Sequence, residues 1–277
     1  MGVLAALGSA LCYGVADFTG GLLSRRVYFV VVALAGQAGG LVLALVTAPL
    51  LSKGVPGIAE LAWGAASGVG TGIGMIFLYR GMSRGSMSVV VPVSAVTGVA
   101  LPVLVGVLLL GDRPQPLPWL GLAVAIPALW LVSRTGDSNH EGVGTAASSD
   151  GLIAGCGIAL QYLALAQAGG GIWAVAAGRF AAVLALLPLA VSARRRPRTG
   201  KWHMAGAVAT GMTAALALIL YSQAVQQQLT VIAVALSSFY PAIPVLLGIT
   251  LLGERLGRMQ VTGLATAGVA IALLALG

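Results

Sequence analysis

The sequence predicts an all-α integral membrane protein, and three observations support that prediction. Hydrophobic side chains make up 58% of the 277 residues, charged ones only 8%, and the mean hydropathy is +1.00. Long apolar runs recur along the whole chain. The basic residues lie almost entirely between those runs. Too few polar groups remain to coat a water-soluble globule, and a helix satisfies its own backbone hydrogen bonds in lipid, so we expect the runs to be membrane-spanning helices.

Ten spans account for the apolar runs. A hydrocarbon core roughly 30 Å thick requires about 20 helical residues per crossing. Windows of that length predict helices at residues 3–23, 28–51, 61–79, 86–110, 117–133, 151–168, 172–191, 203–224, 230–252 and 260–276. The net charge of +8 falls in the short connections, for example at Arg25 and Arg26 after the first span. The charge therefore indicates membrane topology, and we expect no nucleic-acid partner.

The ten spans divide into two similar halves. The longest polar connection, from Ser133 to Asp150, separates five helices from five. From the second span onward the first half is repeated 142 residues later, and the first span matches the sixth at an offset of 149. The matched pairs include Gly36 with Gly178, Tyr79 with Tyr221, Pro102 with Pro244, and Tyr13 with Tyr162. Because each half holds an odd number of crossings, the second enters the membrane from the opposite side, which predicts an inverted-topology repeat of the transporter kind.

A longer motif occurs once in each half. The pattern Pro-x-x-x-Gly-x-x-x-x-Gly-[Asp/Glu]-Arg lies at residues 102–113 and again at 244–255, and each copy precedes a Gly-Leu helix. It resembles the paired EamA-type repeats of the drug/metabolite transporter superfamily. The resemblance implies two five-helix repeats at 1–135 and 151–277, joined by a connecting loop at 136–150. It also implies alternating access and movement of small metabolites, often export, without ATP.

One position departs from the family pattern. The family often carries an arginine in the second helix of each repeat. Here Arg179 keeps that arginine, whereas Gln37 replaces it in the first half. The resemblance therefore implies that this position acts differently in the two halves.

Prolines occur at corresponding places in the fourth and ninth spans. Pro92 and Pro102 are expected to interrupt the fourth, and Pro241 and Pro244 the ninth. Such breaks free backbone groups at membrane depth, which is tolerated where they are buried in protein or face a wet cavity, and paired breaks indicate a central site. The alternative is that the prolines only kink their helices for packing, since proline is common in transmembrane helices.

Asp17 is the acidic residue that lies inside an apolar run. It falls about two-thirds of the way along the first span, where a carboxylate costs about 2.5–3.5 kcal/mol on insertion scales, so we expect it to face a cavity or a partner. A carboxyl there can bind and release a proton as its access to water alternates, as a first-helix carboxylate does in the distantly related small multidrug-resistance proteins. A structural ion pair with Arg179, Arg25 or Arg26 is the alternative.

Arg179 is the basic residue that lies deep inside a span. Its guanidinium cannot lose its charge, so it needs an acid, backbone carbonyls or an anion on the substrate. A carboxylate or phosphate could bind it through two parallel hydrogen bonds. A structural role, as the partner of Asp17 or of freed carbonyls, remains open.

Other polar residues inside the spans complete the predicted pathway for substrate and protons. They are Tyr13, Gln37, Tyr79, Gln161, Tyr162 and Tyr221. Tyrosine combines an apolar ring with one hydroxyl, which suits a pocket for amphipathic metabolites. Tyr79 and Tyr221 lie near span ends, and that position is more typical of interfacial anchors.

The sequence lacks the groups that enzymatic chemistry requires. Both histidines, His140 and His203, lie outside the spans or at a boundary, and no second acid accompanies Asp17. Cys12 and Cys156 have no paired spacing, and no P-loop pattern occurs. We therefore expect no enzymatic activity, no metal and no cofactor.

Together these features predict a secondary-active transporter in the cell (cytoplasmic) membrane. We expect it to move a small metabolite, such as an amino acid or a related zwitterion or anion, most simply by export coupled to a proton or solute gradient. Its expected partners are the lipid bilayer and that small molecule, and a homodimer is left open. The alternative is a non-transporting accessory subunit of a lipid- or metabolite-modifying system.

Two arguments about orientation disagree. Of the 15 basic residues, Lys53 and Arg113 lie in even-numbered connections and Arg179 lies within a span, which leaves twelve in odd-numbered connections. The positive-inside rule then places both termini outside. The family resemblance implies both termini inside, so the orientation stays open.

Overall fold

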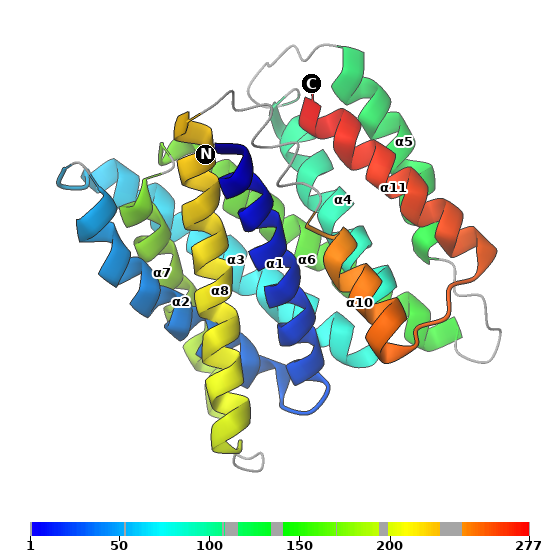
Figure 1. Cartoon of the computed structure of the whole chain (residues 1–277), viewed down its shortest axis with the longest axis horizontal. Coiled ribbons are helices and arrows are strands. Elements are labelled where there is room, and N and C mark those ends of the chain that lie inside the picture. The colour runs from blue at the N-terminus through cyan, green and yellow to red at the C-terminus, as the bar shows by residue number, and fades with distance from the viewer. Residues whose placement is uncertain are drawn as a thin grey trace.

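The computed structural model describes residues 2–52, 54–106, 108, 116–133, 141–169, 171–193, 199–227 and 240–276. Over these ranges it holds ten helices and no strand (Figure 1). The helices are α1 (Gly2–Ser24), α2 (Phe29–Leu51), α3 (Ile58–Arg84), α4 (Met87–Val105), α5 (Pro116–Ser133), α6 (Glu141–Gln167), α7 (Ile172–Ala193), α8 (Lys201–Gln227), α10 (Ala242–Leu252) and α11 (Arg258–Leu276). Each of them overlaps one predicted span, in the same order.

Seven of the described helices are long and apolar enough to cross a membrane. They are α1, α2, α3, α4, α6, α7 and α8. The helices α5, α10 and α11 are apolar but shorter over the residues searched. The prediction of an all-α protein with several helices able to span a membrane is therefore confirmed over the described residues, whereas ten crossings in an inverted repeat remain a prediction.

The largest differences from the predicted spans lie where α3 meets α6. We expected a connecting loop at 136–150, but α6 begins at Glu141, and residues 134–140 lie outside the described ranges. The helix α3 likewise continues to Arg84 instead of ending at residue 79. The two extended ends are joined by Arg80, whose Nε donates to both carboxylate oxygens of Asp150 at 3.0 and 3.1 Å. This bidentate ion pair stabilises the polar end of α3 and the polar first part of α6, which hydropathy alone does not predict to be helical.

The fourth and ninth spans differ in another way. We expected the fourth to reach residue 110, but α4 ends at Val105, and residues 109–115, with the first Gly-Asp-Arg motif, lie outside the described ranges. In the ninth span α10 begins only at Ala242, and residues 228–239 are likewise outside them. The second copy of the motif is fully described.

The helices pack in pairs that bring together distant parts of the sequence. The helix α3 packs on α6 and α7, while α8 packs on α1 and α2. The remaining close pairs are α2 with α7, α4 with α6, and α5 with α11. Figure 1 shows α5 and α11 side by side at one edge of the molecule, and it shows the two ends of the chain, N and C, at the same side. Termini on one side of a membrane require an even number of crossings, which the ten predicted spans would provide.

Close backbone contacts hold the central helices together. A Cβ atom on Gly211 of α8 would collide with the carbonyl oxygen of Gly36 in α2, and one on Gly68 of α3 would collide with the carbonyl oxygen of Gly178 in α7. In lipid, helices associate chiefly through such close van der Waals contact, which glycine permits. The small residues of these helices are therefore packing surfaces.

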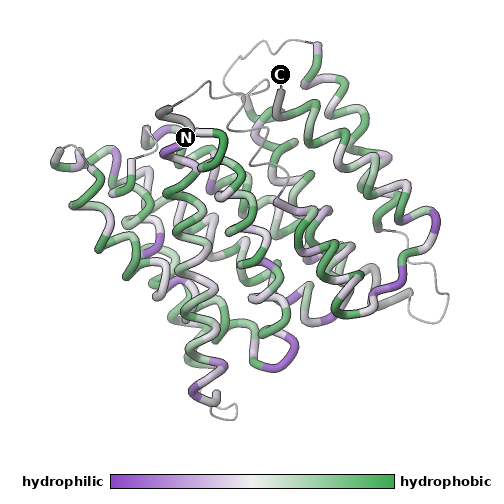
Figure 2. The backbone as a smooth tube through the Cα atoms, in the orientation of Figure 1, coloured by the Kyte–Doolittle hydropathy of each residue, from purple (hydrophilic) through white to green (hydrophobic). Residues whose placement is uncertain are grey.

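Charged residues gather at one end of the bundle, which we call the basic end. Arg25 follows α1, Arg84 ends α3, and Lys201 and Arg258 begin α8 and α11. Arg25 joins three of these ends, since its Nε donates to the carbonyl of Met82 near the end of α3 at 3.2 Å and its Nη2 to Glu254 just before α11 at 2.9 Å. The beginning of α8 lies beside the end of α1, where a Cβ on Gly206 would come within 3.4 Å of Leu23. Figure 2 shows hydrophilic segments at this end, below the apolar middle of the helices. This distribution agrees with charged connections outside the hydrocarbon core.

Candidate functional site

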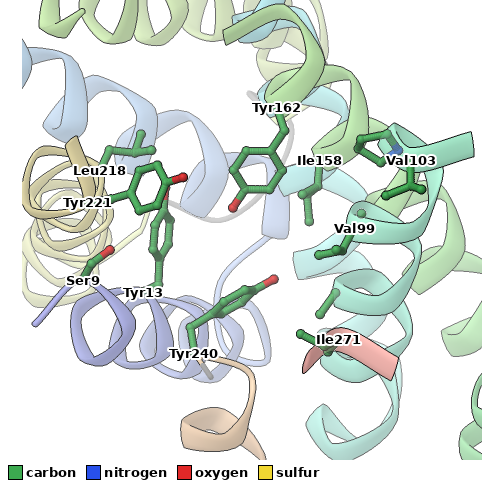
Figure 3. A pocket seen from close by; sticks show the side chains of 13 residues that line it. Ser9, Tyr13, Val99, Val103, Ile158, Tyr162, Leu218, Tyr221, Tyr240 and Ile271 are labelled. Carbon is green, nitrogen blue, oxygen red and sulfur yellow. The ribbon is translucent and has the colours of Figure 1, made fainter. Parts of the chain in front are cut away.

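Two hollows adjoin each other inside the bundle. The larger, which we call the chamber, has a volume of about 270 Å³ and is shown in Figure 3. It is lined by Ser9, Tyr13, Ala95, Gly98, Val99, Pro102, Val103, Ile158, Tyr162, Leu218, Tyr221, Tyr240 and Ile271. The smaller, which we call the annex, has a volume of about 40 Å³. It is lined by Tyr13, Asp17, Thr71, Met75, Leu78, Tyr79, Ile158, Gln161, Tyr162, Arg179, Ala214 and Tyr240.

Three tyrosines stand between the two hollows. Tyr13, Tyr162 and Tyr240 line both of them, and we call this set the tyrosine layer. The rings of Tyr13 and Tyr240 lie 5.8 Å apart between centroids and are tilted by 49°. In Figure 3 the hydroxyl groups of Tyr162 and Tyr240 point into the shared space. The layer therefore separates a mostly apolar chamber from an annex that contains charged groups.

The order of residues along α1 shows how the hollows lie relative to the basic end. Ser9 and Tyr13 line the chamber, Asp17 lines the annex, and α1 then ends at Ser24 beside the basic end. In α8, which begins at the basic end, the chamber residues Leu218 and Tyr221 lie far along the helix. The annex thus lies between the chamber and the basic end.

The chamber offers a bound molecule a hydrogen-bonding group that has no partner in the protein. The hydroxyl of Ser9 already donates to the carbonyl of Ala217 at 2.8 Å. The hydroxyl of Tyr13, by contrast, is buried and makes no hydrogen bond among the described residues. A buried hydroxyl without a hydrogen-bond partner destabilises the folded protein, so a ligand that supplies a polar group to this oxygen would bind favourably.

Arg179 and Gln37 form the clearest polar contact beside the annex. Arg179 Nη1 donates to Gln37 Oε1 at 2.8 Å, and the two residues are 5% and 3% exposed. The arginine side chain lies against Gly40 of α2, where a Cβ atom would come within 3.3 Å of its Cδ. Because a glutamine amide is neutral, this contact orients the guanidinium without neutralising its charge.

Asp17 lies in the same annex but has a different environment. It is 8% exposed, and no salt bridge joins it to Arg179, Arg25 or Arg26 in the described part of the chain. Arg25 instead pairs with Glu254. The structural ion pair that we kept as an alternative for Asp17 is therefore not formed, and the carboxyl borders a hollow.

The predicted polar residues converge on these hollows. Gln161 and Tyr79 line the annex, and Tyr221 lines the chamber. Tyr79 is buried, and Gly20 of α1 leaves space for it, since a Cβ there would lie 2.5 Å from the tyrosine hydroxyl. Tyr79 and Tyr221 thus face the interior, although their sequence positions are more typical of interfacial anchors.

The four prolines behave differently from the expected paired breaks. Pro92 and Pro102 lie inside α4, which continues through both, so the expected interruption of the fourth span is wrong there. A proline still lacks an amide donor, and Pro102 leaves the carbonyl of Gly98, four residues earlier, without its helical bond. Gly98 and Pro102 both line the chamber. Pro241 and Pro244 are at the beginning of α10, where a missing amide donor costs little.

Tyr240 is the main site residue that the sequence analysis missed. It lies within an apolar run and forms a turn just before α10, yet its ring lines both hollows. The repeat offset pairs position 240 with Gly98, which also lines the chamber, but the sequence alone does not show that either residue borders a hollow. A large ring in one half thus stands where the other half has no side chain.

No group of three or more His, Cys, Asp or Glu side chains that could hold a metal occurs among the described residues. The polar groups of the two hollows are the tyrosine hydroxyls, the hydroxyls of Ser9 and Thr71, one carboxyl, one guanidinium and the amide of Gln161, beside an apolar wall. These groups can bind and orient a small molecule and can exchange a proton.

Comparison with known proteins bears on this arrangement. Residues 148–276 match the model of the EamA-like transporter family. The second half of the chain belongs to the EamA-like transporter family. This family is part of the drug/metabolite transporter superfamily, so the expected relationship to that superfamily is confirmed. The matched region contains Tyr162, Arg179, Tyr240 and Glu254. The expected assignment of the first half to a second EamA-like repeat remains a prediction.

One solved structure, a crystal structure of a protein, is similar in fold to this chain over almost its whole length. The similarity covers 98% of this chain and 95% of the other, with a TM-score of 0.61 and 14% sequence identity. At this identity it shows the fold alone. None of the curated proteins compared matches the chain.

Proposed function

We propose that this protein is a secondary-active transporter that moves a small metabolite across the cytoplasmic membrane by alternating access. The observation that carries the proposal is the annex, in which Asp17 and Arg179, each within a helix long and apolar enough to span a membrane, are buried next to an apolar chamber. Intramembrane charged groups are rare and face cavities that serve substrates or ions. The EamA-like region and the apolar helices support a transporter of the drug/metabolite type.

The helix pairing supports two repeats related by a pseudo-two-fold axis. If α1 corresponds to α6 and α3 to α8, the pair formed by α3 and α6 becomes the pair formed by α8 and α1. In the same way the pair of α3 and α7 becomes that of α8 and α2, while the pair of α2 and α7 and that of α5 and α11 become themselves. All of these pairs are close, as a two-fold arrangement requires.

The contact between Arg179 and Gln37 supports the same axis. These residues are 142 positions apart, which is the repeat offset, and they hydrogen-bond to each other. A residue can touch its own counterpart only if both lie beside the symmetry axis. In inverted-repeat transporters the substrate site lies at the interface of the repeats. Because Arg179 also lines the annex, this contact supports the annex as the proposed substrate site.

The groups present favour an amphipathic substrate with a small charged head. An annex of about 40 Å³ offers room for a few water-sized groups, such as a carboxylate or an ammonium, whereas the chamber of about 270 Å³ can hold an apolar body. Arg179 can bind a carboxylate, and Asp17 can bind an ammonium. An amino acid or a related zwitterion or anion, moved outward, fits this division.

Asp17 is the proposed coupling group. Its carboxyl has no salt bridge in the described chain, so substrate and proton can compete for it as the annex opens to alternate faces. If a proton entering the cell replaces the cationic or zwitterionic head of the cargo at Asp17, an inward proton gradient would drive export of the cargo.

Reconstitution of the purified chain alone in proteoliposomes tests the proposal. A comparison of metabolites inside and outside cells, with and without the gene, first identifies the cargo. The flux of that cargo in proteoliposomes should then increase with an imposed proton gradient. No flux from the purified chain, together with flux restored by a second protein, would instead support an accessory subunit.

A further inference from the structure

Glu254, in the second copy of the Gly-Glu-Arg motif, joins several helices at the basic end. Its Oε1 accepts a hydrogen bond from the backbone N–H of Met87 at 3.0 Å and from Arg25 Nη2 at 2.9 Å. Its Oε2 accepts from the N–H of Ser88 at 3.0 Å and from the Ser88 hydroxyl at 2.8 Å. One carboxylate thus connects the end of α1, the first turn of α4 and the end of α10. A negative charge is favourable at the first turn, because the helix dipole is positive there.

The motif supplies the local geometry that this carboxylate needs. Gly253 ends α10 in the left-handed conformation, with φ of 65°, which residues with a side chain rarely adopt. The turn brings the N–H of Glu254 to the carbonyl of Gly248 at 3.1 Å. Gly248 also leaves space for the carboxylate, since a Cβ there would lie 3.0 Å from Glu254 Oε2. Both glycines of the motif therefore serve the placement of Glu254.

Apolar side chains fill the space between this contact and the annex. Asp17 precedes Arg25 by eight residues, or about 12 Å along α1. Between them Phe18 belongs to the same buried cluster as Leu78, Met82 and Met87. Met87 is fully buried, and its N–H is one of the groups that Glu254 binds. Movement of the first turn of α4 away from α1 and α10 would take Met87 out of this cluster and open a path from the basic end toward the annex.

We infer that Glu254 is the positioning residue that keeps the transporter closed at its basic end, and that the annex opens to this face when Glu254 releases the first turn of α4. The inference rests on the proposed alternating access. Glu254 acts through Met87 and its apolar neighbours, and it does not touch the substrate.

Thiol accessibility in the annex tests the inference without knowledge of the substrate. The chain would carry Cys12→Ser and Cys156→Ser, with Thr71→Cys as the reporter in the annex, in sealed vesicles. A membrane-impermeant methanethiosulfonate is applied to one face and then to the other. We expect Glu254→Gln to increase the modification rate from the face of the basic end about tenfold, because the amide loses the charge that strengthens these hydrogen bonds.

Asp150→Asn is the matched control. Asp150 is also a buried carboxylate near the basic end, but its hydrogen bonds go to Arg80 of α3, and among the described residues it makes none to the first turn of α4. We expect it to lower thermal stability without a face-specific change in reporter rate. An unchanged rate in Glu254→Gln, or the same rate increase in Asp150→Asn, would overturn the inference.

Two further variants keep the test decisive if Glu254→Gln does not fold. Arg25→Gln removes one of the four contacts and should give a smaller increase at the same face. Glu254→Asp keeps the charge, as Asp112 does in the first copy of the motif, and should restore a rate near that of the parent. If neither variant behaves in this way, the inference fails even where cargo flux stands. If the parent moves no cargo while the face-specific change occurs, the proposed function fails instead.

Discussion

Replacement of Gln37 by Glu or by Leu gives opposite, measurable effects on Arg179. At present the guanidinium is held by a neutral acceptor at 2.8 Å, in a site where both residues are almost fully buried. Gln37→Glu puts a carboxylate at that distance and makes an ion pair, so the folded state should become more stable while Arg179 becomes less available to an anion. Gln37→Leu removes the acceptor, so stability should fall and the guanidinium becomes available.

The size of both effects follows from the strength of one hydrogen bond to a charged group, about 1.5–3 kcal/mol. In affinity this range corresponds to a factor of about 10–150. We therefore expect Gln37→Glu to raise the KM for an anionic or zwitterionic cargo at least about tenfold, with no comparable change for a neutral analogue. Gln37→Leu should leave that KM unchanged or lower it, and it should lower the unfolding temperature.

The assay combines proteoliposome flux with thermal unfolding of the purified variants. Each variant controls for the other, since they change the same position and shift stability in opposite directions. An unchanged KM for the anionic cargo in Gln37→Glu, in a protein that is as stable as the parent or more so, would refute Arg179 as the anion-binding group. A fall in stability of Gln37→Glu would refute the placement of Gln37 beside Arg179.

Three other outcomes test the remaining parts of the site. Asp17→Asn should retain folding but abolish the dependence of flux on the proton gradient, and a dependence equal to the parent's would remove Asp17 from coupling. Tyr240→Ala should enlarge the chamber and lower the KM for cargo analogues with larger apolar bodies, whereas the same truncation at Tyr28, outside both hollows, should not. Gly211→Ala should lower the free energy of unfolding by about 1–3 kcal/mol or more, and with it the unfolding temperature, because the new Cβ collides with α2. Gly268→Ala is the control: its Cβ meets no atom within 4 Å, so the change should be neutral or stabilising.

The sequence predicted the interior of the bundle better than its ends. Tyr13, Asp17, Gln161 and Tyr162 were expected to face a cavity because polar side chains inside apolar runs are unfavourable elsewhere, and all of them line the two hollows. Their role in transport stays a prediction. This argument depends only on hydropathy and position along a span. It gives no information on which polar residue touches which, so the Gln37 contact of Arg179 had to come from the structure.

The helix ends were missed for a physical reason. The connection that includes residues 141–150 is rich in Gly, Ser, Thr and charged residues, so it was expected to be a loop. Its helical form is supported by a contact between distant residues, the pair of Arg80 with Asp150, and local propensity cannot reveal such a contact. Tyr240 was missed because a tyrosine near prolines resembles ordinary packing until the chamber beside it is known.

The contact between Gln37 and Arg179 also restricts how such a chain could arise from two equal parts. Side chains that meet their own counterparts would be identical in a perfectly duplicated molecule, and two arginines at this spot would place like charges in direct contact without water between them. At least one copy must then change before the fused product can pack well. The glutamine at position 37 satisfies that requirement, and it leaves the molecule with a single positive charge at its centre instead of two that repel.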